Sequence, residues 1–230
     1  MDWQALIELD RQLLLLLNGS ESLYLDTLVH TLTAAVTWVP LYVSLFYLVL
    51  KNNDTVLTIM LIVGAAALCI IIAGTVDDTI VKPLVARWRP THDPQIGAVV
   101  DIVDGYRGGR FGFFSAHACN TFSIAVFFSL LVRSRLLSVS LILWSLVNCW
   151  TRIYLGVHFP GDILVGLLWG GGVGIGVYIL YRRVSRCLTT SMKYVSSKYT
   201  SSGYQIDDID IVIVVLMFTY ICALLRACVF

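Results

Sequence analysis

The sequence predicts an all-α protein that crosses a membrane six times. Hydrophobic residues make up 58% of the 230-residue chain and charged residues only 13%, whereas an ordinary soluble domain is about a quarter charged. Several apolar stretches approach the ~20 residues that an α-helix needs to cross a bilayer. The net charge of +1 argues against a nucleic-acid-binding protein, which would show a basic surface. With no internal repeat and no separate polar domain, residues 1–230 are interpreted as one domain.

The predicted elements begin with a helix over residues 1–19. Its polar residues recur at a helical spacing among many leucines, and it lacks the basic start and small-residue cleavage site of a signal peptide. We therefore expect this helix to lie in the membrane interface. The predicted membrane-spanning helices follow as six apolar stretches, which cover residues 30–50, 56–81, 114–132, 136–154, 160–181 and 209–229.

The orientation is predicted from the connections between these helices. Short loops rich in Lys and Arg tend to stay in the cytoplasm. Lys51, the turn at residues 133–135 and the loop of residues 182–208, which includes Lys193, all fall on one side and are predicted to be cytoplasmic. The connection of residues 82–113 then faces the extracytoplasmic side, although it is also rich in arginine. Positive charge on that side is explained if it binds an anion.

Small residues form two further patterns. Gly166, Gly170 and Gly174 recur every four residues in the fifth span, and such a ridge lets helices approach closely. We expect it to serve core packing, with a homo-oligomer through the same ridge as the alternative. The six cysteines show no CxxC pairing, so we interpret them as buried hydrophobic residues and not as disulfides or a zinc site.

The stretch of residues 151–162 places three ionisable residues between two apolar runs. These are Arg152, His158 and Asp162, and charge at membrane depth is costly enough to mark a functional site. Pro160 predicts the start of a helix, which directs Asp162 back toward the loop that carries His158. The carboxylate could then accept a hydrogen bond from one imidazole nitrogen and leave the other free to attack. A capped helix start with a structural histidine is the alternative.

Two other stretches converge on the same side of the membrane. Lys82 and Arg89 follow the second span, and the third span begins with Ser115, Ala116 and His117. Phosphoryl transfer spreads negative charge over three equatorial oxygens, so it relies on positive charge and hydrogen-bond donors. The lysine and arginines are candidate clamps, and the serine hydroxyl and the free N–H groups of the helix start add donors.

The two histidines receive different roles. His158 has a carboxylate partner and is the candidate nucleophile, whereas His117 is the candidate general acid. Simpler interpretations exist for each group taken singly. Lys82, Arg87 and Arg89 could extend to the membrane interface, Ser115 could be only a helix N-cap, and His117 could be a satisfied core histidine.

Three motifs summarise these residues: Lys82-x6-Arg89-Pro90, Ser115-x-His117 and Arg152-x5-His158-x3-Asp162. Together they resemble the three-part signature of the type 2 phosphatidic acid phosphatase (PAP2) family of membrane lipid phosphatases. The resemblance implies a six-helix membrane fold with an extracytoplasmic active site and no metal or other cofactor. It implies a phosphohistidine on His158, oriented by Asp162, with His117 as general acid. The residues implied to bind phosphate are Lys82, Arg89, Ser115 and Arg152, and the N–H of Ala116 adds to them.

Phe114 and Ala116 depart from this family, which usually has proline and glycine at these positions. The departure concerns substrate size and access more than chemistry. We expect a phosphatase of the bacterial inner membrane, with undecaprenyl diphosphate as the preferred substrate. Lipid A phosphates, phosphatidylglycerophosphate and phosphatidic acid are alternatives, and Arg107 to Arg110 are expected to cover the site. Alternatives of another class are an anion transporter and a non-catalytic lipid-binding protein.

Overall fold

The computed structural model describes residues 3–188 and 197–229, and every regular element within them is a helix. This confirms the all-α prediction. The longer helices are α1 (Trp3–Leu17), α2 (Leu23–Thr33), α3 (Val39–Lys51), α4 (Val56–Val76), α6 (Ala116–Val132), α7 (Arg135–Tyr154), α8 (Pro160–Leu188) and α9 (Ile206–Val229). Shorter pieces are the 3₁₀ turns Ala35–Trp38, Pro90–His92 and Val103–Gly105, the π-helix Asp77–Val81 and α5 (Lys82–Val85).

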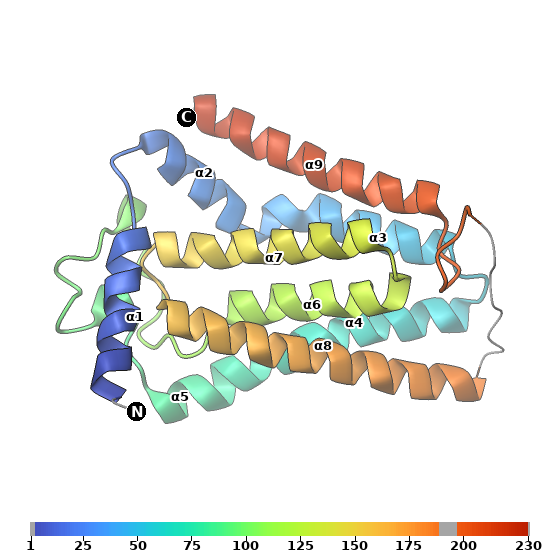
Figure 1. The fold of residues 1–230 in the computed structure, drawn as a ribbon, viewed down its shortest axis with the longest axis horizontal. Coiled ribbons are helices and arrows are strands. Elements are labelled where there is room, and N and C mark those ends of the chain that lie inside the picture. The colour runs from blue at the N-terminus through green and yellow to red at the C-terminus, as the bar shows by residue number, and fades with distance from the viewer. Residues whose placement is uncertain (1–2, 189–196, 230) are drawn as a thin grey trace.

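The helices form a bundle whose members run along one long axis, and α1 crosses one end of it (Figure 1). The connection between α5 and α6 lies at that same end. Among the described residues, four helical stretches are long and apolar enough to cross a membrane, or five if the bent pair α2–α3 counts as one span. The chain is therefore a multi-pass membrane protein.

Three predicted boundaries are wrong. The span expected over residues 30–50 is broken, because α2 and the stretch from Ala35 to Lys51 meet at an angle of 65°. Side chains replace backbone partners at this break: Thr37 Oγ1 donates to the carbonyl of Thr31 at 2.6 Å, and Trp38 Nε1 donates to that of Leu32 at 2.8 Å. Pro40 in the first turn of α3 has no N–H to continue the helix.

The other two corrections concern helices that run further than expected. The second span continues through the π-helix to Val85, so Lys82 lies on a helix and not in a polar connection. Helix α8 extends to Leu188, past the predicted end at residue 181, and α9 begins at Ile206. The predicted loop of residues 182–208 is therefore helical at both ends, and Lys193 lies outside the described residues.

The glycine ridge of α8 packs against α6. A Cβ added at Gly166 would lie 2.9 Å from the carbonyl oxygen of Ser115, and one at Gly174 would lie 2.7 Å from that of Ser123. Gly170 likewise faces the backbone of Cys119. Only glycine allows so close an approach, which confirms the core-packing prediction for this ridge.

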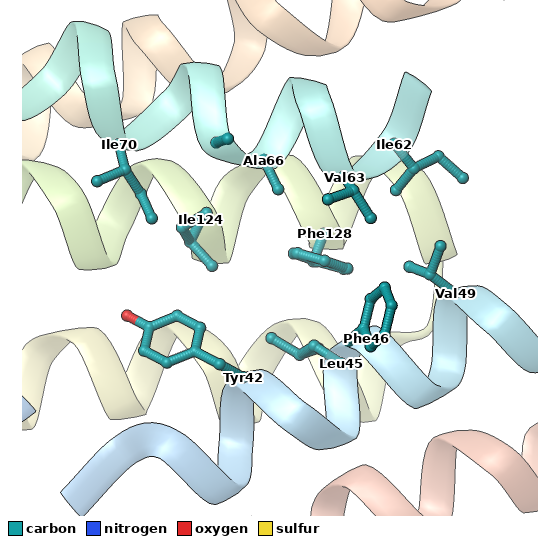
Figure 2. A pocket seen from close by; sticks show the side chains of 11 residues that line it. Tyr42, Leu45, Phe46, Val49, Ile62, Val63, Ala66, Ile70, Ile124 and Phe128 are labelled. Carbon is teal, nitrogen blue, oxygen red and sulfur yellow. The ribbon is translucent and has the colours of Figure 1, made fainter. Parts of the chain in front are cut away.

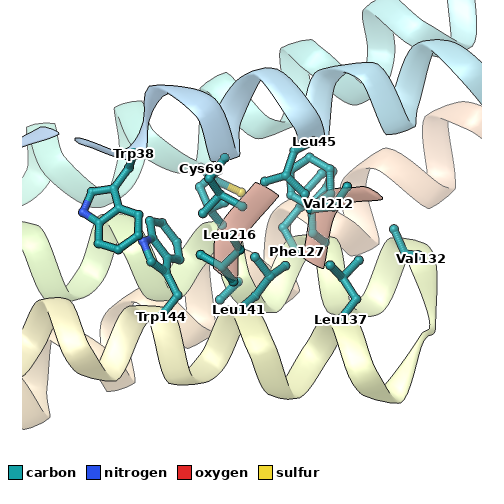
Figure 3. Close-up of a cluster of buried hydrophobic side chains, with 14 of the residues drawn as sticks. Trp38, Leu45, Cys69, Phe127, Val132, Leu137, Leu141, Trp144, Val212 and Leu216 are labelled. Atoms are coloured by element: carbon teal, nitrogen blue, oxygen red, sulfur yellow. The ribbon is translucent and has the colours of Figure 1, made fainter. Parts of the chain in front are cut away.

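The interior of the bundle is apolar. Trp38 and Trp144 meet edge to face with ring centroids 5.7 Å apart, beside other buried side chains of the core (Figure 3). A cavity of about 260 Å³ lies between α3, α4 and α6, with Leu45 and Phe128 among its apolar lining residues (Figure 2). All six cysteines are free. Only half are buried, contrary to the prediction: Cys69, Cys119 and Cys149 are buried and Cys187, Cys222 and Cys228 are exposed.

Candidate active site

The three sequence motifs meet at the end of the bundle that α1 crosses. The positive charges of Arg89, Arg152 and Lys82 all act on the imidazole of His158. His117, in the first turn of α6, lies within electrostatic range of the same three cations and of His158. The structure therefore brings together both histidines and all three predicted cations, from segments far apart in the chain.

His158 lies in the turn between α7 and α8 and is only 1% exposed. Its Nδ1 is 3.7 Å from Asp162 Oδ2, and Asp162 itself is fully buried. This distance exceeds that of a hydrogen bond, although catalytic contacts are often long without substrate. Burial lowers the pKa of His158 well below 6.5, and Arg89, Arg152 and Lys82 lower it further by repelling a positive charge. The imidazole is thus neutral at neutral pH, as a nucleophile must be.

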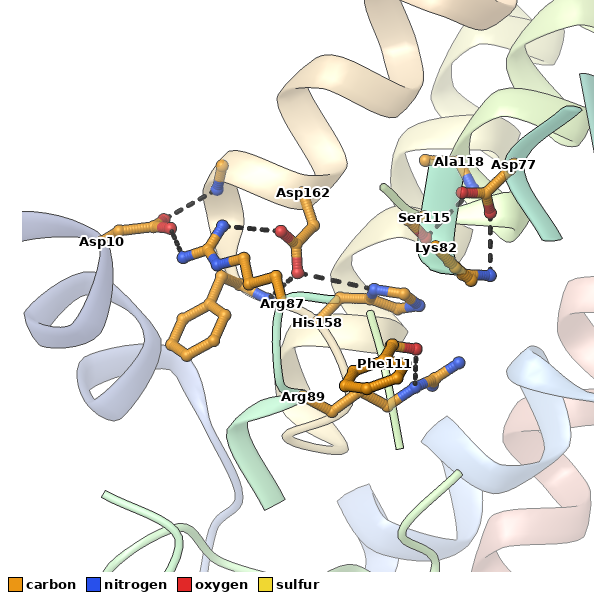
Figure 4. A network of polar contacts seen from close by, with 12 residues as sticks. Asp10, Asp77, Lys82, Arg87, Arg89, Phe111, Ser115, Ala118, His158 and Asp162 are labelled. Carbon is orange, nitrogen blue, oxygen red and sulfur yellow. Dashed lines mark hydrogen bonds and ion pairs between the residues drawn. The ribbon is translucent and has the colours of Figure 1, made fainter. Parts of the chain in front are cut away.

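Asp162 makes its shortest contact with Arg87, a residue outside the predicted site. Arg87 Nη1 donates to Asp162 Oδ1 at 2.6 Å, while the N–H of Phe159 donates to Asp162 Oδ2 at 3.1 Å (Figure 4). The sequence did contain a signal for this arginine. Arg87 and Arg89 flank Trp88, and residues two apart in extended backbone point to the same face. Trp88 pairs with Phe111 in an isolated antiparallel bridge.

Two arginines face the site with unused donors. Arg152 is 2% exposed and donates to Thr33 Oγ1 at 2.7 Å and to the hydroxyl of Tyr106 at 3.2 Å. Arg89 Nε donates to the carbonyl of Phe111 at 3.1 Å. Arg152 Nε and Arg89 Nη1 are buried, and within the described chain they have no hydrogen-bond partner. Unmade hydrogen bonds on buried cations are costly, which indicates a site for an anion.

The backbone of the connection between α5 and α6 lies close against Arg89. Gly108 has a φ of +65°, and a Cβ there would lie 2.5 Å from Arg89 Nη1. A Cβ on Gly112 would lie 2.9 Å from Arg89 Cγ and 3.5 Å from Asp162 Oδ2. The two glycines therefore let the backbone approach the arginine and the carboxylate together.

Lys82 is already paired with acidic residues. Its Nζ lies 2.8 Å from Asp77 Oδ2 and 2.5 Å from Asp78 Oδ1, and Asp77 is fully buried. Asp78 and Lys82 are four apart and so are neighbours on a helix surface, whereas Asp77 is five apart and is brought alongside Lys82 by the π-helix Asp77–Val81. The lysine was predicted as a simple phosphate clamp, but two carboxylates already share its charge.

Ser115 is the N-cap of α6. Its Oγ accepts a hydrogen bond from the N–H of Ala118 at 3.5 Å, and its own N–H donates to the carbonyl of Asp162 at 3.2 Å. The N-cap interpretation is therefore correct for its hydroxyl in this structure. The backbone bond ties the start of α6, with Ala116 and His117, to the start of α8.

The chain is similar in sequence to a known family and to several known proteins. The family model of the PAP2 superfamily matches residues 65–186. The chain is 40% identical over 183 residues to a lipid A 4'-phosphatase of Bacteroides thetaiotaomicron. The matched stretch covers 79% of this chain and 81% of that protein. It is 36% identical over 180 residues to a lipid A 4'-phosphatase of Porphyromonas gingivalis, with coverages of 77% and 75%.

A shorter similarity extends to a third protein. The chain is 37% identical over 95 residues to a decaprenylphosphoryl-5-phosphoribose phosphatase of Mycobacterium tuberculosis. The matched stretch covers 41% of this chain and 48% of that protein. No solved structure shows a significant match.

Proposed function

This chain belongs to the PAP2 superfamily, and on that premise we propose that it removes the 4'-phosphate of lipid A or of a closely related lipid. Two relatives that match over more than three quarters of the chain carry that activity in their names, so they favour this alternative over the undecaprenyl diphosphate preferred from the sequence. The observation that carries the chemistry is the neutral, buried His158 beside Asp162, facing two arginines with unused donors.

The proposed reaction has two steps. The free Nε2 of His158 attacks phosphorus, a P–N bond forms, and the bond to the lipid oxygen breaks as His117 donates a proton to that oxygen. Water then attacks the phosphohistidine while His117 takes its proton, and inorganic phosphate leaves with His158 regenerated. Asp162 stabilises the positive charge that develops on the imidazole during the first step.

Phosphate binding is assigned to the donors around the histidines. Arg89 and Arg152 hold the equatorial oxygens with their unused N–H groups, which act best in a water-poor site. The N–H groups at the start of α6, from Ala116 onward, add a favourable dipole. Ser115 and Lys82 contribute only if they turn from their present partners toward the phosphate.

We further propose six membrane spans, with the broken pair α2–α3 as the first and α6 as the third. A helix of 17 residues is about 25 Å long, which lies at the lower limit for crossing a bilayer. Helix α1 is proposed to lie in the interface at the extracytoplasmic face of the bacterial inner membrane. The basic residues Lys51 and Arg133 support this orientation, since they lie at the opposite end from the site. A homo-oligomer would need a face other than the glycine ridge, which α6 covers.

A phosphate-release assay on purified protein tests the proposal. The panel contains lipid A, undecaprenyl diphosphate, phosphatidylglycerophosphate and phosphatidic acid, and His158→Ala serves as the inactive control. Lipid A should be the fastest substrate, with loss of one phosphate by mass spectrometry. Faster turnover of undecaprenyl diphosphate would mean that the substrate assignment is wrong. No release from any lipid would favour an anion transporter or a non-catalytic lipid-binding protein.

A further inference from the structure

The N-terminal helix α1 contacts the charged residues of the proposed site through the carboxylate of Asp10. Its Oδ2 accepts a hydrogen bond from Arg87 Nη2 at 2.6 Å, and its Oδ1 accepts one from the N–H of Gly161 at 2.7 Å. Figure 4 shows Asp10, Arg87, Asp162 and His158 in one continuous series of contacts. Asp10 thus contacts both the arginine that holds Asp162 and the helix turn from which Asp162 projects.

The contacts divide the guanidinium of Arg87 between two carboxylates. Nη1 bonds to Oδ1 of Asp162 at 2.6 Å, and Nη2 bonds to Asp10. Arginine otherwise tends to bind one carboxylate with both of its terminal NH₂ groups, here called its two arms. Because Asp10 occupies the second arm, Asp162 keeps its Oδ2 for the N–H of Phe159 at 3.1 Å and for His158 Nδ1 at 3.7 Å.

The surroundings leave Arg87 little freedom. Its Cζ lies 4.2 Å from the ring centroid of Phe159, a cation–π distance. The side chain of Asp10 is 14% exposed and that of Asp162 is fully buried. Gly161 has no Cβ, and one built there would lie 2.9 Å from Asp10 Oδ2, so the glycine leaves room for this close approach of the aspartate.

We propose that Asp10 is a positioning residue, which holds one arm of Arg87 so that Asp162 keeps an oxygen aimed at His158. The inference rests on the proposed phosphatase function and adds the N-terminal helix to its machinery. Without the negative charge of Asp10, Arg87 turns both arms onto Asp162, and the carboxylate supports the imidazole less well during attack. The lipid and its phosphate need not touch Asp10 for this effect.

Helix α1 also provides a matched control. Arg11, the next residue, forms an ion pair with Asp93 at 3.3 Å and so fastens the same helix to the connection after α5. Arg11→Gln removes one charged tether of α1 without changing a contact of Arg87. Asp10→Asn removes the other tether with the same change of one charge and a similar side-chain size.

Kinetics distinguish positioning from simple attachment of the helix. Asp10→Asn should lower kcat about 10- to 100-fold with KM within about twofold, whereas Arg11→Gln should keep both within about twofold. When Asp10→Asn is added to Asp162→Asn, kcat should fall by a further factor of less than about two. The effect of Asp10 acts through the carboxylate of Asp162, which the double variant no longer has. Equal losses in Asp10→Asn and Arg11→Gln, or losses that multiply with Asp162→Asn, would overturn the proposal.

Amide hydrogen exchange provides a readout that needs no turnover. The N–H of Phe159 bonds to Asp162 Oδ2, so its exchange should accelerate in Asp10→Asn and stay unchanged in Arg11→Gln. Unchanged protection at Phe159 in Asp10→Asn would refute the positioning role, even if no lipid were hydrolysed. A failure of the wild type to release phosphate would instead count against the proposed function. Faster exchange along every helix would mean that Asp10 supports the whole fold, which also overturns the proposal.

Discussion

Replacing Asp162 by Asn tests how the charge of a buried carboxylate contributes to attack by His158. The change preserves size and keeps an oxygen that can accept from the N–H of Phe159, now at 3.1 Å from the carboxylate. Arg87 loses its charged partner in α8 but keeps Asp10. We therefore expect a folded protein, less stable by about 1.5–3 kcal/mol, the usual contribution of a hydrogen bond to a charged group.

The loss of turnover follows from the distance between the imidazole and the carboxylate. A positive charge that develops on His158 at 3.7 Å from Asp162 gains about 4.5 kcal/mol at an effective dielectric constant of about 20. Because about 1.36 kcal/mol corresponds to a factor of ten in rate, losing the whole of this interaction would lower kcat roughly a thousandfold. Arg87 neutralises part of that charge at 2.6 Å. We therefore expect kcat to fall about 10²- to 10³-fold, judged by Coulomb's law.

Phosphate release from lipid A in detergent micelles measures this loss, with thermal unfolding as the check on folding. Asp104→Asn is the matched control, because Asp104 is an exposed aspartate whose φ of 49° suits asparagine. The control should keep wild-type turnover. Turnover of Asp162→Asn within about fivefold of the wild type would contradict the electrostatic argument and reduce Asp162 to a helix-start residue.

Two further predictions test the proposed mechanism, and a third tests the proposed topology. Hydrolysis should continue in excess EDTA and be inhibited by vanadate, a mimic of the transition state; activity lost in EDTA and restored by Mg²⁺ would contradict a clamp made of side-chain cations. Radiolabelled aryl phosphate should leave base-stable label on His117→Ala, whose dephosphorylation is slow, and none on His158→Ala; the opposite pattern would reverse their roles. In a cysteine-free background, an impermeant reagent should label Val99→Cys and not Asp54→Cys in intact cells, and the reverse would invert the topology.

The sequence predicted that the residues of the third motif lie close together, because that motif is local. Arg152, His158 and Asp162 lie within eleven residues of one another, so a turn followed by a helix start is enough to bring them together. The bounds of α6 and α7 were also predictable, because a basic turn at residues 133–135 separates the two apolar runs. The break between α2 and α3 was not, because it depends on Thr37 and Trp38 bonding to backbone carbonyls, a choice made by tertiary packing.

Long-range charge pairing was the part that the sequence could not supply. Arg87 meets Asp10 across 77 positions in the chain and Asp162 across 75, and no spacing rule connects residues so far apart. Arg87 was visible only as a cation beside Trp88, which is equally typical of a membrane interface. The pairing of Lys82 with Asp77 was closer in sequence, but it required knowing that the second span continues as a helix to Val85.

These pairings decide which charges remain for the substrate. Lys82 and Arg87 each lie against two carboxylates, so neither offers a free positive charge. Arg89 and Arg152 contact neutral partners instead, and within the described residues no carboxylate lies in ion-pair range of either. Their combined charge of two matches a phosphate monoester, which carries about −1.5 to −2 at pH 7. A diphosphate carries more, and would have to draw Lys82 from two acids, one of them buried. Within the proposed site, as far as the described residues show, this charge balance favours a lipid phosphate monoester, because the carboxylates neutralise Lys82 and Arg87 and leave Arg89 and Arg152 for the anion.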